Sequence, residues 1–264
     1  MESSQLNNAI TSILKGSFDL NVKTLPNTQS VMRMDGIDTA KYAFEFEMLG
    51  FALNSNEYVT TPSSQMLNRM YPGINIVGSI SLNYPLRKGD VEDTGNAANI
   101  GTKIVRLQQA TSLNSIEHPL ELEKLISTIK NNDMLLICQN LSVDESKSIL
   151  ELAKSEGINK LMTYHPMQST SIDDLKHMAS LGAYIELAFN DLMPLSANIT
   201  IETMCKTIKE IGADYCVATT RFGDIELPPP AEGMRMFIAC LLETGFSENN
   251  VSKLVKINPN KLIS

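Results

Sequence analysis

The stretch Phe18-Asp19-Leu20-Asn21-Val22-Lys23 decides how this sequence folds. Apolar and polar residues alternate along it, which is the pattern of a β-strand whose two faces meet different surroundings. The pattern predicts that Asp19, Asn21 and Lys23 point one way and the three apolar residues the other. A buried polar group without a partner costs roughly 1–3 kcal/mol. We therefore expect the polar face to line a wet cavity at the mouth of a barrel.

Strand and helix patterns alternate along the rest of the chain, which is typical of parallel βα units around one sheet. The predicted strands cover residues 18–23, 50–55, 74–82, 102–107, 133–138, 160–165, 183–189 and 214–219. The predicted helices cover residues 1–15, 38–49, 62–71, 90–100, 120–131, 142–157, 171–181, 200–211, 231–244 and 247–255.

Eight strands, each followed by a helix, predict an α/β fold of the (β/α)8 TIM barrel type. The length of 264 residues suits such a barrel, which has about 250 residues. An open, doubly wound sheet is the alternative. No internal repeat or linker divides the sequence, so we expect one domain over 1–264, with 1–15 as an N-terminal lead-in helix that covers one barrel end or forms a dimer contact.

Composition and charge exclude several classes of protein. The formal net charge is −8, and no basic run is longer than Arg87-Lys88, so we expect no nucleic-acid partner. The sequence has no apolar run of 18 residues and no signal-peptide pattern at its start, so we expect a cytoplasmic protein with no membrane contact. The four cysteines lie in apolar contexts without C-x-x-C spacing, which indicates core residues, and no glycine cluster has nucleotide-binding spacing.

Polar residues gather where the predicted strands end. Active sites of (β/α)8 barrels lie at the C-terminal ends of the strands. The residues at those positions are Asn21, Lys23, Asn54, Asn140, His165, Glu186, Thr220 and Arg221.

Several motifs in this sequence resemble those of amidohydrolase-type metal-dependent hydrolases. They are the run 182–186 (GAYIE), the strand end 164–166 (YHP), the closing-helix stretch 228–238 (PPPAEGMRMFI) and the tail 258–262 (NPNKL). The sequence is most similar to PHP/amidohydrolase-like barrels that begin with an Asp-Leu-His-Val-His strand. The resemblance runs from about Gly16 to Leu262, nearly the full chain.

The resemblance implies a divalent metal held by two His of the first strand, further His of the fifth and sixth strands and an Asp of the eighth, which together activate a water. This sequence departs from that set at most positions. Asp19 and the strand-six His165 keep their places, whereas Asn21, Lys23, Asn140 and Arg221 stand at ligand positions. Lysine and arginine are cations that do not ligate a metal under ordinary conditions. We therefore expect no metal at this site and no cofactor.

Lys23 and Arg221 suggest how the electric charge at the barrel mouth is balanced without a bound metal ion. Our hypothesis is that Lys23 and Arg221 pair with Asp19 and Glu186. Lys23, His165 and Glu186 are the candidate catalytic residues, and the candidate ligand-binding residues are Asp19, Asn21, Asn54, Asn140 and Arg221. For Lys23 a structural ion pair is weighed against a nucleophile of lowered pKa, and for His165 a hydrogen-bonded relic against a catalytic role.

Three functions remain open from the sequence. The first is a non-catalytic relative of the hydrolases that binds a small anion at the mouth formed by Lys23 and Arg221. The second is an enzyme with metal-independent acid, base or lysine chemistry in the same pocket. The third is a hydrolase with an altered metal site. A homo-oligomer through the first 15 residues is a further expectation.

Overall fold

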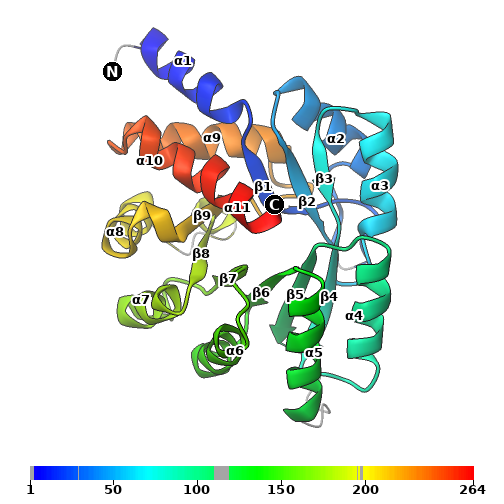
Figure 1. The fold of residues 1–264 in the computed structure, drawn as a ribbon. Coiled ribbons are helices and arrows are strands. Elements are labelled where there is room, and N and C mark those ends of the chain that lie inside the picture. Colours follow the sequence, from blue (N-terminus) through cyan, green and yellow to red (C-terminus); the bar gives the residue numbers. More distant parts are fainter. Residues whose placement is uncertain (1–2, 29, 110–118, 195, 197–198) are drawn as a thin grey trace.

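The computed structural model describes residues 3–28, 30–109, 119–194, 196 and 199–264. Its nine parallel strands form a ring with the helices outside (Figure 1). The strands are β1 (Phe18–Lys23), β2 (Gly50–Asn54), β3 (Asn75–Val77), β4 (Ser79–Tyr84), β5 (Ile104–Gln109), β6 (Leu135–Gln139), β7 (Leu161–Tyr164), β8 (Ala183–Ala188) and β9 (Cys216–Thr219).

The helices follow the predicted order along the chain. They are α1 (Ser3–Leu14), α2 (Gly36–Glu45), α3 (Thr61–Met70), α4 (Asp90–Asn99), α5 (Pro119–Asn131), α6 (Val143–Ser155), α7 (Ile172–Ser180), α8 (Ile201–Ile211), α9 (Pro230–Glu243), α10 (Glu248–Ser252) and α11 (Asn258–Ile263). No helix in these ranges is long and apolar enough to cross a membrane.

The predicted strand 74–82 is divided at Gly78 into β3, which pairs with β2, and β4, which pairs with β5. A Cβ atom at Gly78 would lie 2.4 Å from the Cα of Thr61, so only glycine lets the start of α3 approach this closely. Side chains bridge the resulting gap, since the Ser79 hydroxyl donates to the carbonyl of Leu53 at 2.6 Å. Counting β3 and β4 as one interrupted strand gives the eight strands of the predicted barrel.

Most element boundaries differ from the prediction by a few residues, and two of the differences have a clear physical cause. Helix α2 begins at Gly36, before the predicted residue 38, because the Asp35 side chain accepts from the backbone N–H of Asp38 and caps it. The last helix continues past residue 255 through a π-turn into α11. Pro259 lacks an N–H, which breaks the helical ladder there, and the Asn258 amide donates to the carbonyl of Cys216 at 2.7 Å.

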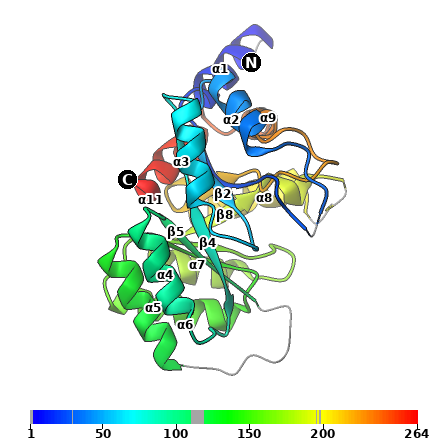
Figure 2. The same ribbon diagram turned by 90° about the vertical axis from the view of Figure 1, so that its right-hand side faces the viewer.

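A small apolar cluster fills the barrel near the end at which the strands begin. Its members come from strands all around the ring and from α11: Phe18, Leu20, Ala52, Val77, Ile104, Leu135, Ile137, Met162, Val217 and Leu262. Because Leu262 packs in the same cluster as the first residue of β1, α11 closes this end. In the side view, α11 and the loop that follows β1 lie at opposite ends (Figure 2).

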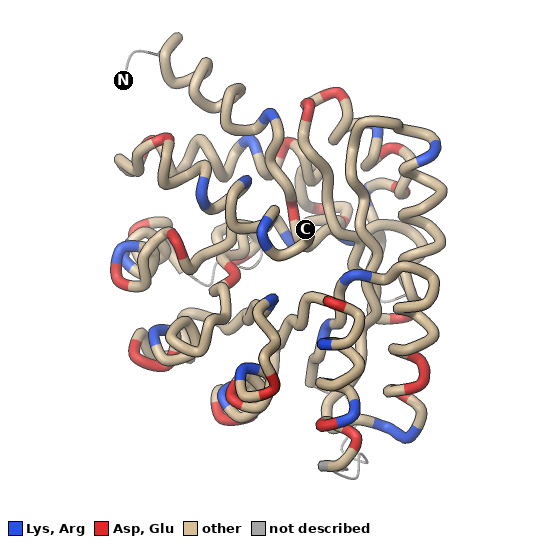
Figure 3. Tube along the Cα trace, in the orientation of Figure 1, with Lys and Arg blue, Asp and Glu red and all other residues tan. Residues whose placement is uncertain are grey.

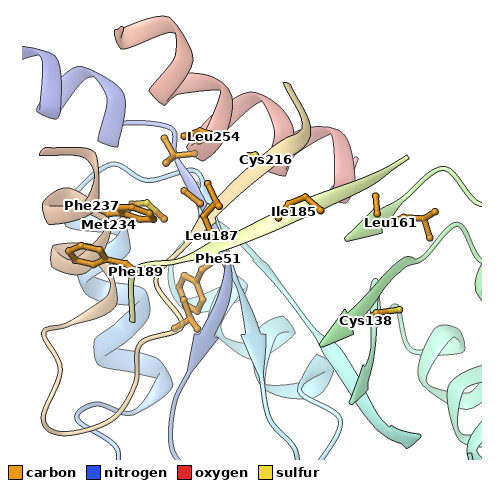
Figure 4. Close-up of a cluster of buried hydrophobic side chains, with 14 of the residues drawn as sticks. Phe51, Cys138, Leu161, Ile185, Leu187, Phe189, Cys216, Met234, Phe237 and Leu254 are labelled. Atoms are coloured by element: carbon orange, nitrogen blue, oxygen red, sulfur yellow. The ribbon is translucent and has the colours of Figure 1, made fainter. Parts of the chain in front are cut away.

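A larger apolar cluster lies between the strands and the surrounding helices. Part of it is drawn in Figure 4, where Leu187 and Phe189 face Met234 and Phe237 of α9. The rings of Phe189 and Phe237 stack with their centroids 4.8 Å apart. This packing fixes the helices outside the ring and leaves the end at which the strands finish for polar residues.

Candidate functional site

Inward-facing residues change from apolar to polar along several strands. On β5 the order is Ile104, Arg106, Gln108, and on β6 Ile137 is followed by Gln139. The first residue of each series belongs to the inner apolar cluster, and the polar residues that follow are buried or half-buried. Most charged residues lie on the outer helices (Figure 3), so charged residues on the strands are exceptions. These polar residues define the mouth at the C-terminal end of the barrel.

The predicted alternation along residues 18–23 is wrong in the middle of the strand. The β1–β2 register shifts between Asp19 and Val22, so that Leu20 and Asn21 together oppose the single residue Ala52. Such a bulge places two consecutive residues out of alternation. Leu20 joins the inner apolar cluster, whereas Val22 joins the outer one.

Asp19 lies at the seam between β1 and β9. Its carboxylate accepts from the backbone N–H of Thr220 at 3.2 Å, from the Thr220 hydroxyl and from the N–H of Asn21 at 3.1 Å. Burial raises the pKa of Asp19 to about 7, because loss of solvation outweighs these hydrogen bonds. Asp19 therefore joins two strands and forms no ion pair with Lys23 or Arg221 in the described structure.

Glu186 of β8 is the centre of the mouth. Its Oε1 accepts from the Asn21 amide at 2.9 Å and from the Thr219 hydroxyl at 2.7 Å. Its Oε2 lies 3.6 Å from Nη1 of Arg221. The Asn54 amide in turn donates to Oδ1 of Asn21 at 2.8 Å. The structure thus brings together four of the residues selected from the sequence, and Thr219 is an addition.

Arg221 is held by its backbone and by an aromatic ring. Its φ of 55° is in the left-handed region, which is uncommon for a residue with a side chain. Its guanidinium carbon lies 3.9 Å from the centroid of the Tyr164 ring. The Tyr164 hydroxyl donates to Oδ1 of Asp191 at 2.9 Å, and burial raises the pKa of Asp191. Sequence reasoning did not select Tyr164 or Asp191 as site residues.

Lys23 has no carboxylate oxygen within 4.0 Å of its ammonium group among the described residues, so its predicted pairing with Asp19 or Glu186 is not found. Burial lowers the pKa of Lys23, and Arg221 and Arg106 lower it further, against the charge of Asp224. Its backbone N–H donates to the carbonyl of Phe222 at 2.9 Å. Only the Arg221–Glu186 half of the ion-pair hypothesis matches the structure.

Arg106 is a fully buried site residue that sequence reasoning missed. Burial lowers its pKa to about 10; Glu186 raises that pKa and Arg221 lowers it, so all three side chains share one electrostatic environment. A signal was present in the sequence, since Arg106 and Gln108 alternate with Val105 and Leu107 as the polar residues of 18–23 do.

Two predicted site residues lie away from this group. Asn140 is exposed, with a φ of 56°, and the inward position belongs to the buried Gln139, whose amide donates to Gln108 at 3.1 Å. His165 follows the inward-facing Tyr164, and burial lowers its pKa against the opposing charge of Asp174 on α7. His165 lies just beyond the end of β7, and the charged residue that acts on it belongs to the outer helix α7.

The mouth does not fit the divalent metal that the resemblance implied. Arg106 and Arg221 place positive charge beside Glu186, and Asn21 and Thr219 occupy its Oε1 with hydrogen bonds. No three His, Cys, Asp or Glu side chains are arranged to hold a metal ion anywhere in the described ranges. The donor set at the mouth therefore does not suit the activation of a water by a metal.

Residues 16–186 match the model of a family of unknown function, DUF6282, over more than half of the chain. The chain belongs to this family. No curated protein matches this DUF6282 member.

Several solved structures share the fold of this DUF6282 chain. The phosphotriesterase homology protein from Escherichia coli, complexed with phosphate in its active site, has a TM-score of 0.68 at 15% identity, over 95% of this chain and 99% of that one. An organophosphorus hydrolase from Deinococcus radiodurans has a TM-score of 0.66 at 12% identity, over 95% and 93%. A probable 2-pyrone-4,6-dicarboxylic acid hydrolase from Acinetobacter baumannii, with citric acid bound, has a TM-score of 0.62 at 14% identity, over 94% and 99%. The predicted (β/α)8 barrel is thereby confirmed.

Proposed function

We propose that this protein binds a small anion at the barrel mouth and is not a metal-dependent hydrolase. The observation that carries the proposal is the set of cations there. Lys23, Arg106 and Arg221 influence one another electrostatically, and only Arg221 has a carboxylate oxygen within 4.0 Å among the described residues. Lys23 and Arg106 thus have no carboxylate in direct contact, and cations without such a partner attract an anion strongly in a site shielded from water.

Titration calorimetry at low salt tests this proposal. Inorganic phosphate and citrate are suitable probes, since these two anions occupy solved barrels of the same fold. We expect binding that weakens at least about tenfold in Lys23→Met and in Arg221→Met, because each substitution removes a charge from the shielded mouth. Lys15→Met is the matched control, since Lys15 is exposed and pairs with Glu47.

The outcomes of this experiment separate the functions. Equal binding by the wild type and both mouth variants contradicts the proposal. Elemental analysis is the second arm: stoichiometric zinc, iron or manganese that depends on Glu186 or His165, together with a hydrolysis that it supports, also contradicts it.

A second candidate function is lysine chemistry, which one observation favours. Burial and the neighbouring Arg221 lower the pKa of Lys23, and a neutral amine is a nucleophile. Such an amine adds to a carbonyl carbon, the hydroxyl of the adduct leaves as water, and a C=N bond remains. Reduction with borohydride in the presence of pyruvate, followed by mass spectrometry, detects this product at Lys23. Absence of a modified Lys23 contradicts this second function and leaves the first intact.

A further inference from the structure

Arg106 crosses the inside of the barrel. It starts on β5, whose neighbours are β4 and β6, yet its Nη2 donates to the carbonyl of Leu20 on β1 at 2.7 Å. Leu20 lies in the irregular part of the β1–β2 register. The guanidinium therefore lies over the inner apolar cluster, to which Leu20 and Ile104 belong, and forms the floor of the mouth.

Half of the buried side-chain polar atoms that lack a hydrogen bond in the described residues belong to this mouth. Eight buried side-chain nitrogen and oxygen atoms make no hydrogen bond within the described part of the chain, and four of them are Arg106 Nη1, Arg221 Nη1, Glu186 Oε2 and Gln139 Oε1. Two are donors that carry positive charge, and two are acceptors. Arg221 Nη1 and Glu186 Oε2 face each other at 3.6 Å, an ion pair that is too long for a hydrogen bond. Buried polar groups normally have partners, so a cluster of four calls for a ligand or ordered water.

The hydrogen-bonding needs of these four atoms indicate which groups a ligand must carry. The two guanidinium nitrogens require an anionic acceptor, whereas Glu186 Oε2 and Gln139 Oε1 require a donor such as a hydroxyl group. A plain carboxylate would bind the arginines but supply no donor, so Glu186 Oε2 would keep only its 3.6 Å ion pair with Arg221 and Gln139 Oε1 would gain no hydrogen bond.

We propose that the ligand is a small hydroxylated anion. Arg106 and Arg221 bind its carboxylate or phosphate group, and Glu186 Oε2 accepts a hydrogen bond from its hydroxyl. This inference rests on the proposed anion-binding function and adds to it a binding role for Arg106 and a class of ligand.

Pairs of ligands with and without a hydroxyl group test whether that group contributes to binding. Calorimetry compares glycolate with acetate, malate with succinate, and glycerol 3-phosphate with propyl phosphate; each pair has the same anionic groups and differs in its hydroxyls. We expect the hydroxylated member of at least one pair to bind about tenfold more tightly, because a hydrogen bond to a charged buried acceptor is stronger than one to water. The pair that shows the preference identifies the anionic group.

Glu186→Gln is the matching variant. The substituted side chain keeps one oxygen for Asn21 and Thr219 and places an amide nitrogen, a donor, at the position of Oε2. We expect the hydroxyl preference to disappear while the plain anion still binds. Asp224→Asn is the control, because it removes a carboxylate near Lys23 without touching Glu186. It should keep the preference.

Four results are informative. A preference that is lost in Glu186→Gln and kept in Asp224→Asn supports the inference. Equal affinities within every pair, with binding still dependent on Arg221, overturn the hydroxylated ligand and leave the anion-binding function standing. A preference that persists in Glu186→Gln overturns the role of Glu186. Failure of all these anions to bind overturns both proposals. The wild-type comparison alone is decisive if the variant does not fold.

Discussion

The carboxylate of Asp19 holds Thr220 by two kinds of hydrogen bond, one from its backbone N–H and one from its hydroxyl. Asp19 lies on the first strand, and Thr220 directly follows the last. No ladder pairs β1 with β9 in the described structure. The Asp19 side chain therefore supplies hydrogen bonds between β1 and the end of β9, where most other neighbouring strands are joined by backbone hydrogen bonds. The barrel is thus closed by an ionisable group.

The first prediction concerns the pH dependence of stability. The pKa of Asp19 is about 7 in the folded chain and near 3.8 in the unfolded one, so the folded state binds the proton more tightly. The favourable contribution is complete below pH 4 and is lost as the pH rises to about 7, a change on the order of 4 kcal/mol. Other carboxyl groups also titrate there, so the measurement is a difference between two proteins.

Asp19→Asn isolates this contribution, because asparagine resembles the protonated acid and does not titrate. Urea unfolding of both proteins between pH 4 and 8 should show the wild type losing stability relative to Asp19→Asn as the pH rises. A stability difference that does not vary over this range would contradict the prediction.

The second prediction separates the two contacts of Tyr164. Tyr164→Phe removes the hydrogen bond to Asp191 but keeps the ring against Arg221, so stability should fall by about 1–2 kcal/mol while anion affinity changes little. Tyr164→Leu removes the ring as well and should weaken anion binding severalfold. Calorimetry on both variants checks this, and equal affinities for the two would show that the ring does not position Arg221.

The elements were predictable because local patterns agree with the fold. Ser142 and Glu145 form the reciprocal capping box that their spacing indicates, and the Ser171 side chain caps α7 by accepting from the N–H of Asp174. The order of strands and helices followed from the same kind of local signal.

The site was predictable only in part. Alternation assumes regular pairing, and the register shift at Leu20–Asn21 depends on β2, which the sequence of β1 does not reveal. One residue of register separates Asn140 from Gln139 and decides which of them enters the barrel. Arg106 was overlooked because a buried arginine inside an apolar strand is rare, and its partner, the Leu20 carbonyl, is 86 residues away.

The third prediction tests the capping box. Ser142→Ala removes an acceptor for the backbone N–H of Glu145 and should destabilise the protein by about 1 kcal/mol. Ser155→Ala is the control at the other end of α6, where the exposed hydroxyl donates to the carbonyl of Leu152 and caps no free N–H group. Its effect on the free energy of unfolding should be near zero, and an equal loss in both variants would contradict the capping role.

The fourth prediction compares two glycine substitutions that should change the free energy of unfolding in opposite directions. A Cβ atom at Gly223 would lie 2.4 Å from the carbonyl oxygen of Lys23, so Gly223→Ala must push apart the backbone that joins β1 to the end of β9. We expect a loss of about 1–3 kcal/mol and weaker anion binding, because Lys23 is part of this contact and Arg221 is two residues from Gly223 in the chain. Gly95 lies inside α4 with open space around it, so Gly95→Ala should stabilise the protein by about 0.5–1 kcal/mol. Urea unfolding measures both values, and an unchanged or raised stability in Gly223→Ala would show that this close approach does not hold the mouth together.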